Sequence, residues 1–384
     1  MKTKWRAPRI PPVRTAFTTT ISRALLAALL PVASVARSAQ PEPVSVRIRE
    51  PWGNVFADRE TVFHAAVSSH AAFEGKIGWR FASRGATLAR GEQAVSHTPT
   101  QPAVIDIHLR MPAVNQGVVA TAALNVSAID TDTGRTAGAC AKTLRVFPET
   151  PFAHRQAWLK ALNLRLFDPE RTTSEVFLEA GIPFQAVRNV DTLSELRDAV
   201  LVVGEGVSFR DYRGLWAALV RTAASGVPVL CLAPAAGEIV VPGMGDAGNL
   251  PVPRRLAFRR RDVIRALDKR LDADAWPPDG KIIASRIRCA GERGPVVGRI
   301  EHKGEGWPWV EMEFDGAKEA RLIVCGFAVI QKWTSGPSPR FLLAKLLEVP
   351  LTPTPAPEPP SWGEADPSPR MPAAVPSRRR EGED

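Results

Sequence analysis

Residues 199–234, AVLVVGEGVSFRDYRGLWAALVRTAASGVPVLCLAP, contain the two apolar runs that decide the fold of the C-terminal half. The runs at 199–203 and 227–232 are short and continuous, which is typical of strands buried on both faces, and a helical spacing fills 212–225 between them. Gly226 before Pro228 ends that helix. The same alternation extends upstream, with strands predicted at 164–167 and 184–187 and helices at 173–180 and 192–197. Strands that alternate with helices predict a parallel sheet covered on both faces, and the short crossovers favour a flavodoxin-like, doubly wound domain.

Beyond this alternation, Gly, Pro and Arg interrupt the pattern over 235–280. Strands predicted at 282–289, 295–302 and 309–314 form an antiparallel excursion, so we expect an insertion at about 235–315. A buried strand at 321–328 and a helix at 339–348 then close the domain. The helix has an apolar face of Phe341, Leu342, Leu346 and Leu347. The α/β domain is therefore predicted to occupy residues 160–349.

The preceding segment reads as an all-β domain at 42–150. Its strands are predicted from β-branched, aromatic and alternating residues at 44–49, 61–68, 76–82, 103–110, 118–129 and 142–147. Asp132-Thr133-Gly134 supplies a hairpin turn before the last strand. Six or seven short strands without helical periodicity indicate an immunoglobulin-like β-sandwich, and the missing Cys–Trp–Cys pattern excludes an antibody-type domain.

The two ends of the chain have a different composition. Basic residues precede the apolar run at 24–36, which ends in small residues and is too short to span a bilayer, so 1–39 is predicted to be a signal peptide cleaved between Arg37 and Pro41. The alternative is an uncleaved anchor. We expect an exported protein, periplasmic or extracellular, with no transmembrane span in the mature chain. Residues 350–384 are Pro-rich and predicted to be disordered.

The net charge of +10 depends largely on the leader. Six of the 50 basic residues and none of the 40 acidic ones lie in residues 1–36, so cleavage leaves 44 against 40, about +4. This excess is too small to indicate a nucleic-acid partner. The four cysteines, Cys140, Cys231, Cys289 and Cys325, form no C-x-x-C pair, and no two of the six histidines have zinc-ligand spacing. The sequence therefore implies no metal and no cofactor.

The strand–helix order and the phrase VPVLCLAP at 227–234 resemble the class I glutamine amidotransferase-like superfamily. In active members a Cys follows this strand within a tight G-x-C-x-G elbow. Here Ala233 falls at the elbow, while Cys231 lies earlier, within the strand. The activating His-x-Glu pair is also missing, since Glu301 precedes His302 and Lys303 follows it. The resemblance therefore implies a domain without its catalytic residues.

The chain is more similar to non-catalytic versions of this domain in bacterial glycoside hydrolases, such as the trimerisation domain of β-galactosidases. The similarity rests on RLIVCG at 321–326, QKW at 331–333, Pro339 and FLL at 341–343. It implies a β-sandwich neighbour and a carbohydrate-associated role. The catalytic (β/α)₈ barrel of such enzymes needs about 250 residues, and the chain has no room for one beside the sandwich.

Three acidic residues are candidates for a ligand site at the carboxyl ends of the predicted parallel strands, where doubly wound folds usually bind ligands. They are Asp168, Glu205 and Glu238. They could hold a cation or hydrogen-bond sugar hydroxyls. Alternatively, Asp168 begins the turn before Pro169, Glu205 is a solvated loop acid, and Glu238 has no specific role.

Two further groups have both a functional and a structural interpretation. A run of arginines could attract an acidic polysaccharide, a lipid headgroup or an acidic partner, or could be a solvated helix face and loop. It comprises Arg254, Arg255, Arg259, Arg260 and Arg261. Trp307 and Trp309 would share one face of an extended chain, as a sugar-stacking platform requires, or would cover the edge of a core.

These patterns lead to two functional expectations. The first is an exported, non-catalytic binding or assembly protein, carbohydrate-associated or partnered with another cell-envelope protein, and able to oligomerise. The second is a hydrolase that uses Asp168 and Glu205 as a carboxylate pair on a small substrate.

Overall fold

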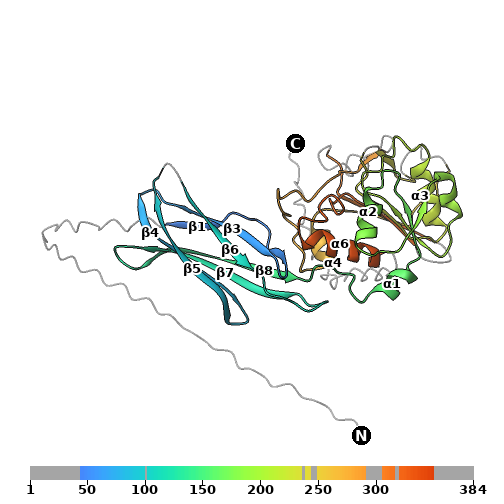
Figure 1. Ribbon diagram of the computed structural model, residues 1–384. Coiled ribbons are helices and arrows are strands. Elements are labelled where there is room, and N and C mark those ends of the chain that lie inside the picture. Colours follow the sequence, from blue (N-terminus) through green and yellow to red (C-terminus); the bar gives the residue numbers. More distant parts are fainter. Residues whose placement is uncertain are drawn as a thin grey trace, which may run out of the picture. The chain divides into compact units, whose positions relative to one another are not determined.

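The computed structural model describes residues 44–99, 102–235, 238–243, 249–290, 305–315 and 320–349. The predicted leader at 1–39, the predicted tail at 350–384 and the predicted strand at 295–302 lie outside these residues. The protein is mostly β, with several sheets and few helices (Figure 1). No helix of the described residues is long and apolar enough to cross a bilayer.

The N-terminal part is a β-sandwich of a three-stranded sheet and a five-stranded sheet. The first has the order β1-β3-β6 and the second β2-β8-β7-β4-β5. Alternation decides which side chains point inward: Ile105, Ile107 and Leu109 of β6 are buried while their neighbours face outward. The strands are β1 (Ser45–Ile48), β2 (Asn54–Phe56), β3 (Glu60–Ser68), β4 (Phe73–Ser83), β5 (Ala86–His97), β6 (Ala103–Arg110), β7 (Ala120–Asp130) and β8 (Thr136–Phe147).

The predicted hairpin turn between β7 and β8 is confirmed. Gly134 has φ 65°, and the carboxylate of Asp130 accepts hydrogen bonds from both the backbone N–H (2.7 Å) and the hydroxyl (2.8 Å) of Thr133. Strands β2 and β5 were not predicted. Most side chains of β5 are exposed, so the strand lacks the alternation by which a half-buried strand is recognised.

The C-terminal part is built on a seven-stranded sheet with the order β10-β9-β11-β12-β17-β16-β14. The first five strands pair in parallel, and the last two are antiparallel. Numbered along the chain, the parallel strands have the spatial order 2-1-3-4-5. The strands are β9 (Leu164–Phe167), β10 (Gln185–Val187), β11 (Val200–Val203), β12 (Val229–Leu232), β14 (Arg255–Arg259), β16 (Trp309–Phe314) and β17 (Ala320–Cys325).

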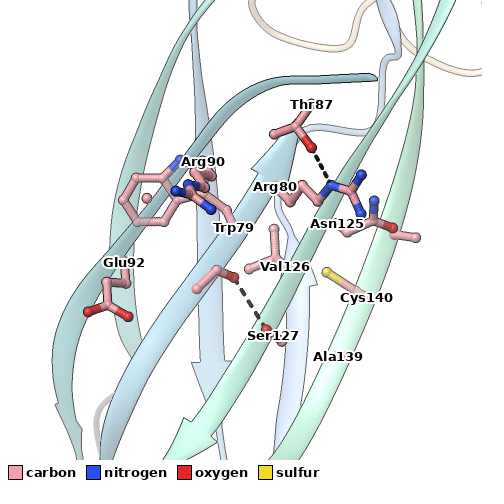
Figure 2. Close-up of a pocket in the computed structure, with 13 residues that line it drawn as sticks. Trp79, Arg80, Thr87, Arg90, Glu92, Asn125, Val126, Ser127, Ala139 and Cys140 are labelled. Carbon is pink, nitrogen blue, oxygen red and sulfur yellow. Dashed lines mark hydrogen bonds between the residues drawn. The ribbon is translucent and has the colours of Figure 1, made fainter. Parts of the chain in front are cut away.

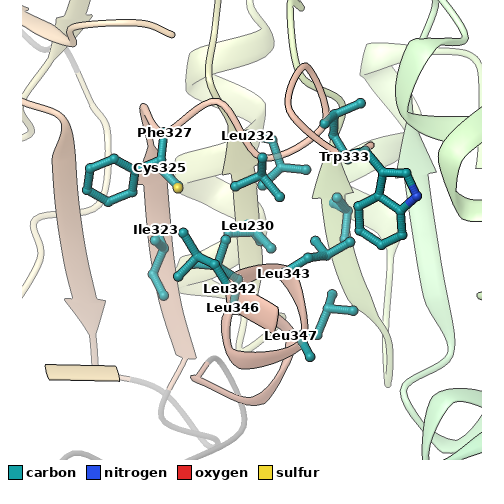
Figure 3. Close-up of a cluster of buried hydrophobic side chains, with 14 of the residues drawn as sticks. Leu230, Leu232, Ile323, Cys325, Phe327, Trp333, Leu342, Leu343, Leu346 and Leu347 are labelled. Carbon is teal, nitrogen blue, oxygen red and sulfur yellow. The ribbon is translucent and has the colours of Figure 1, made fainter. Parts of the chain in front are cut away.

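Hydrophobic clusters cover both faces of this sheet. One contains side chains of α1, α2, α4 and α6, and the other contains side chains of η1 and α3. Figure 3 shows how leucines of α6 pack on β12 and β17, and Leu342, Leu343, Leu346 and Leu347 have no exposed surface. The helices are α1 (Gln156–Ala161), α2 (Thr172–Glu179), the 3₁₀ helix η1 (Val190–Glu195), α3 (Leu215–Ala224), α4 (Asp262–Leu267) and α6 (Pro337–Glu348).

Two predicted helices differ from the structure, one in its first residue and one in its type. α3 begins three residues later than predicted because Gly214 takes a left-handed conformation (φ 77°) at its N-cap. The predicted helix at 192–197 is instead the short 3₁₀ helix η1, whose N-cap residue Asn189 accepts a hydrogen bond from Asp191 N.

The insertion at about 235–315 contains antiparallel strands, as the sequence predicted, but only in part. β14 and β16 extend the main sheet as antiparallel strands, but β13 (Glu238–Val240) and β15 (Arg288–Ala290) pair in parallel as a separate sheet. Instead of a strand at 282–289, the chain forms single bridges from Ile283 to Phe327 and from Ile287 to Trp307 before β15.

Hydrogen bonds join the sandwich to the second part at β2. The carboxylate of Asp272 accepts the backbone N–H groups of Gly53 (3.0 Å) and Asn54 (2.9 Å). The side-chain amide of Asn54 donates to Arg270 O and to the hydroxyl of Ser338, both at 2.9 Å.

Candidate functional site

A cleft of about 480 Å³ lies where β11 and β12 end. We call it the Glu205 cleft. The first parallel strand, β9, and the third, β11, are neighbours, and residues that follow each of them reach the cleft. The lining residues are Thr172, Glu175, Val176, Glu205, Gly206, Ala233, Pro234, Ala235, Ala284, Ser285, Ile330 and Gln331.

Glu205 is buried in the wall of this cleft, with 8% of its surface exposed. Its two carboxyl oxygens accept backbone N–H groups from the segment after β17, Ile330 N at 2.7 Å and Gln331 N at 3.1 Å. Burial raises the pKa of Glu205 from 4.5 to about 7, and these hydrogen bonds oppose the shift without cancelling it. Glu205 is therefore not the solvated loop acid of the alternative interpretation, and near neutral pH it is divided between its two protonation states.

Asp168 follows β9, and its side chain binds the first turn of α2. Its Oδ2 accepts the backbone N–H of Ser174 at 2.7 Å, in the first turn of that helix. Its Oδ1 lies against Gly204, where an added Cβ would stand 2.4 Å away. Among the described residues, Asp168 does not line the Glu205 cleft. The structure thus favours the interpretation that Asp168 begins a turn, and adds that it caps α2, over a shared site with Glu205.

Glu238 does not extend the carboxyl edge of the parallel strands. It opens β13, where it is paired with Arg288 of β15 in the separate two-stranded sheet. The described residues contain no group of three or more His, Cys, Asp or Glu side chains that could hold a metal ion.

At the position that the resemblance assigns to the catalytic elbow, the chain has Ala233 followed by Pro234. Ala233 has no nucleophile, and its N–H donates to Cys325 O at 2.6 Å. Pro234, which follows, has no N–H to offer an oxyanion. Burial raises the pKa of the Cys231 thiol far above its ordinary value and that of Cys325 to about 12, so both remain thiols at neutral pH.

The arginines at 254–261 lie in β14 and beside it, not on a helix face. Arg254 pairs with Glu313 (3.6 Å) and Asp315 (3.5 Å), and Arg255 pairs with Glu313 (3.6 Å). Arg261 donates to the backbone oxygen of Asp274 at 3.4 Å. Arg259 is partly buried in β14, and Arg260, which follows it, is exposed. Acidic neighbours thus offset the charge of Arg254 and Arg255, two of the five arginines that the sequence assigned to an anion patch.

The two tryptophans do not form a sugar platform. Trp309 is 1% exposed and packs in the cluster that α6 covers, whereas Trp307 is half-buried and packs with the opposite cluster beside Phe258. Alternation would place both indoles on one face of a regular strand, but β16 begins only at Trp309. The structure therefore favours the core-covering interpretation.

Sequence reasoning found Glu205 but missed its partners. The amides of Ile330 and Gln331 are more than 120 residues away along the chain, and no motif marks them. The only available signal was the apolar strand at 320–325, whose carboxyl end leads into this segment.

Comparison with known proteins gives weak results. No family model and no curated protein matches the chain. Among solved structures, it is similar to the sporulation control protein Spo0M of Bacillus subtilis (12% identity, TM-score 0.24, covering 31% of this chain and 54% of that one). It is also similar to a cycloisomaltooligosaccharide glucanotransferase of Paenibacillus (10% identity, TM-score 0.23, covering 52% and 28%) and to a fibronectin(III)-like module of Clostridium thermocellum (12% identity, TM-score 0.18, covering 27% and 94%). The chain thus spans about half of the first of these structures and about a quarter of the second. Likenesses this weak carry no inference about function.

Proposed function

We propose that the protein is an exported, non-catalytic binding or assembly protein. Its parts would be a signal peptide at 1–39, an immunoglobulin-like sandwich at 42–150, a flavodoxin-like domain at 160–349 and a Pro-rich tail at 350–384. The observation that carries the proposal is the Ala233-Pro234 elbow, which offers neither a nucleophile nor an oxyanion donor. The protein would act by binding at the Glu205 cleft.

The strand order supports the flavodoxin-like assignment. The parallel order 2-1-3-4-5 is that of flavodoxin-like sheets, whose ligands bind at the carboxyl ends beside the point where the order reverses. In this sheet the reversal falls between β9 and β11. The Glu205 cleft, which lies where β11 and β12 end and is also lined by Thr172 after β9, is beside that point, and this supports the assignment.

The ligand that best fits the cleft is a small hydroxylated molecule such as a sugar unit. A cleft of about 480 Å³ is within the range of small-molecule sites, roughly 300 to 1,000 Å³. The side chains of Glu175 and Gln331 offer hydrogen-bonding groups along its lining, and Val176 adds an apolar contact. The hydroxyls of Thr172 and Ser285 donate to Glu205 O (3.1 Å) and Pro234 O (2.6 Å), and their oxygens can still accept from a ligand.

The hydrolase alternative, in the form that pairs Asp168 with Glu205, receives less support. Paired acid–base work needs two carboxyl groups in one cleft, within roughly 10 Å. Asp168 caps α2 and does not line the Glu205 cleft, and both oxygens of Glu205 already accept backbone N–H groups.

Titration of the mature chain with mono- and oligosaccharides, followed by calorimetry, tests the proposal. Gln331→Ala and Glu175→Ala, at exposed positions of the cleft, should each weaken binding about fivefold or more, as expected for the loss of one hydrogen bond. Glu179→Ala, on α2 but outside the cleft, should leave it unchanged. The proposal fails if no sugar binds, or if the control variant weakens binding as much as the cleft variants.

A further inference from the structure

A second hollow, of about 1030 Å³, lies on the five-stranded sheet of the sandwich (Figure 2). It faces away from the sandwich core, and we call it the outer groove. Directly paired residues of antiparallel strands point to the same side of a sheet, so the register of β5, β4, β7 and β8 defines the rows of side chains across it.

The floor of the outer groove is made of small side chains. Gly78 of β4 pairs with Ser127 of β7, which pairs with Ala139 of β8, and in the next row Asn125 pairs with Ala141. A floor without large side chains lets a ligand approach the sheet closely. Trp79 is not part of this floor: its indole lies over Gly91, on the side that packs against the sandwich core.

Two arginines stand on one side of this floor. Arg80 of β4 and Arg90 of β5 are directly paired, an arrangement in which like charges repel. Arg80 is held by a hydrogen bond from its Nε to Thr87 Oγ1 at 2.8 Å. Among the described residues Arg90 has no ion pair, and the nearby Glu92 is paired with Lys76 at 3.2 Å. The pair therefore lacks an anion that would offset its charge.

We propose that the outer groove binds an oligosaccharide that carries carboxylate groups. Arg90 and Arg80 would hold a carboxylate through their planar guanidinium groups, and Asn125, Ser127 and Thr87 would hydrogen-bond the hydroxyls of the adjoining sugar rings. Glu92 lies in the same groove, but Lys76 offsets its charge at 3.2 Å. The site is distinct from the Glu205 cleft and does not depend on it.

The test uses the mature chain and an oligogalacturonide as the probe, with a neutral oligosaccharide of equal length and an oligoglutamate peptide beside it. The uronide alone should bind, more weakly as salt is raised. Arg90→Gln and Arg80→Gln should each weaken binding about tenfold, since each removes a charge-assisted contact. Arg47→Gln, an exposed arginine on the opposite sheet, should change it less than twofold, and Gln331→Ala should not change it.

Equal thermal midpoints of the wild-type protein and the variants will show that each folds. The proposal is overturned if the uronide does not bind, if Arg47→Gln weakens binding as much as Arg90→Gln, or if the neutral sugar binds equally well. Equal binding of oligoglutamate, lost with the same arginine, would also overturn it and assign the groove to an acidic protein partner.

Discussion

At the scale of single residues, Glu205 joins two segments that are distant in sequence. It sits after β11 and accepts the amides that follow β17, while its own N–H donates to Thr173 Oγ1 at 2.8 Å. Burial makes ionisation of this carboxyl costly, so the folded state is most stable when Glu205 is neutral, although the two hydrogen bonds themselves favour the carboxylate.

The raised pKa predicts a pH-dependent stability. Because the pKa of folded Glu205 is higher than its unfolded value near 4.5, its stabilising contribution is present in acid and is lost as the pH rises through 7. Between pH 5 and 8 the loss in free energy of unfolding should be about 2 to 3 kcal/mol. Glu205→Gln should flatten this part of the profile, as measured by urea unfolding at a series of pH values. Glu175→Gln, exposed in the same cleft, should keep the wild-type slope, and an identical slope in Glu205→Gln would contradict the assignment.

The four cysteines should differ in reactivity. Cys231, Cys289 and Cys325 are buried, whereas Cys140 is only partly buried. Burial raises the pKa of the Cys140 thiol less than those of Cys231 and Cys325. A thiol reagent applied to the native protein at pH 8 should modify Cys140 first, and the other three only on unfolding. Peptide mapping by mass spectrometry identifies the modified thiol. Rapid native labelling of Cys231 would show that β12 is more accessible than its burial indicates.

At the scale of elements, the strands that the sequence predicted well are those whose side chains are apolar because they are buried. β9, β11 and β16 lie within a residue of their predicted bounds because each is a continuous apolar run or alternates against a core. β5 and β14 were missed for the opposite reason: both are edge strands rich in polar side chains, and pairing with a neighbour, not side-chain burial, makes them strands. The partners of the candidate sites could not be predicted either. The side chains of the outer groove are neighbours only through strand pairing, and the amides that bind Glu205 are distant in sequence, so no local pattern marks them.

The last helix, α6, should be indispensable. Its four fully buried leucines are each worth roughly 1.5 to 3 kcal/mol, against a typical total stability of about 5 to 15 kcal/mol. A chain that ends at Ser338 should therefore fail to fold, whereas one that ends at Val349 should keep the thermal midpoint of the full chain. Circular dichroism and thermal scans of the two truncations compare them. A folded product ending at Ser338 would show that α6 is not needed to cover the sheet.

At the scale of the whole molecule, the sandwich and the C-terminal part are linked by a small set of contacts around β2. Arg340 of α6 lies over the ring of Phe56 at 4.8 Å and donates to Glu149 O at 3.0 Å, and the rings of Phe147 and Phe341 meet at 4.8 Å. With the hydrogen bonds of Asn54, these contacts tie the sandwich to the first turns of α6. They predict that the two parts unfold together.

Asn54→Ala should uncouple them. Asn54 is 2% exposed, and removing its amide leaves the hydroxyl of Ser338 and the backbone oxygen of Arg270 without this donor, at a cost of about 1 to 3 kcal/mol. Because that cost falls on the junction and not on either core, calorimetry should change from a single transition to two partly separated ones, with faster proteolysis between residues 148 and 155. Asn125→Ala, a matched change on the outer sheet face, should keep a single transition. Two transitions already present in the wild-type protein would show that the junction is too weak to couple the parts. A single, unshifted transition in Asn54→Ala would show that the aromatic contacts hold them together without this side chain.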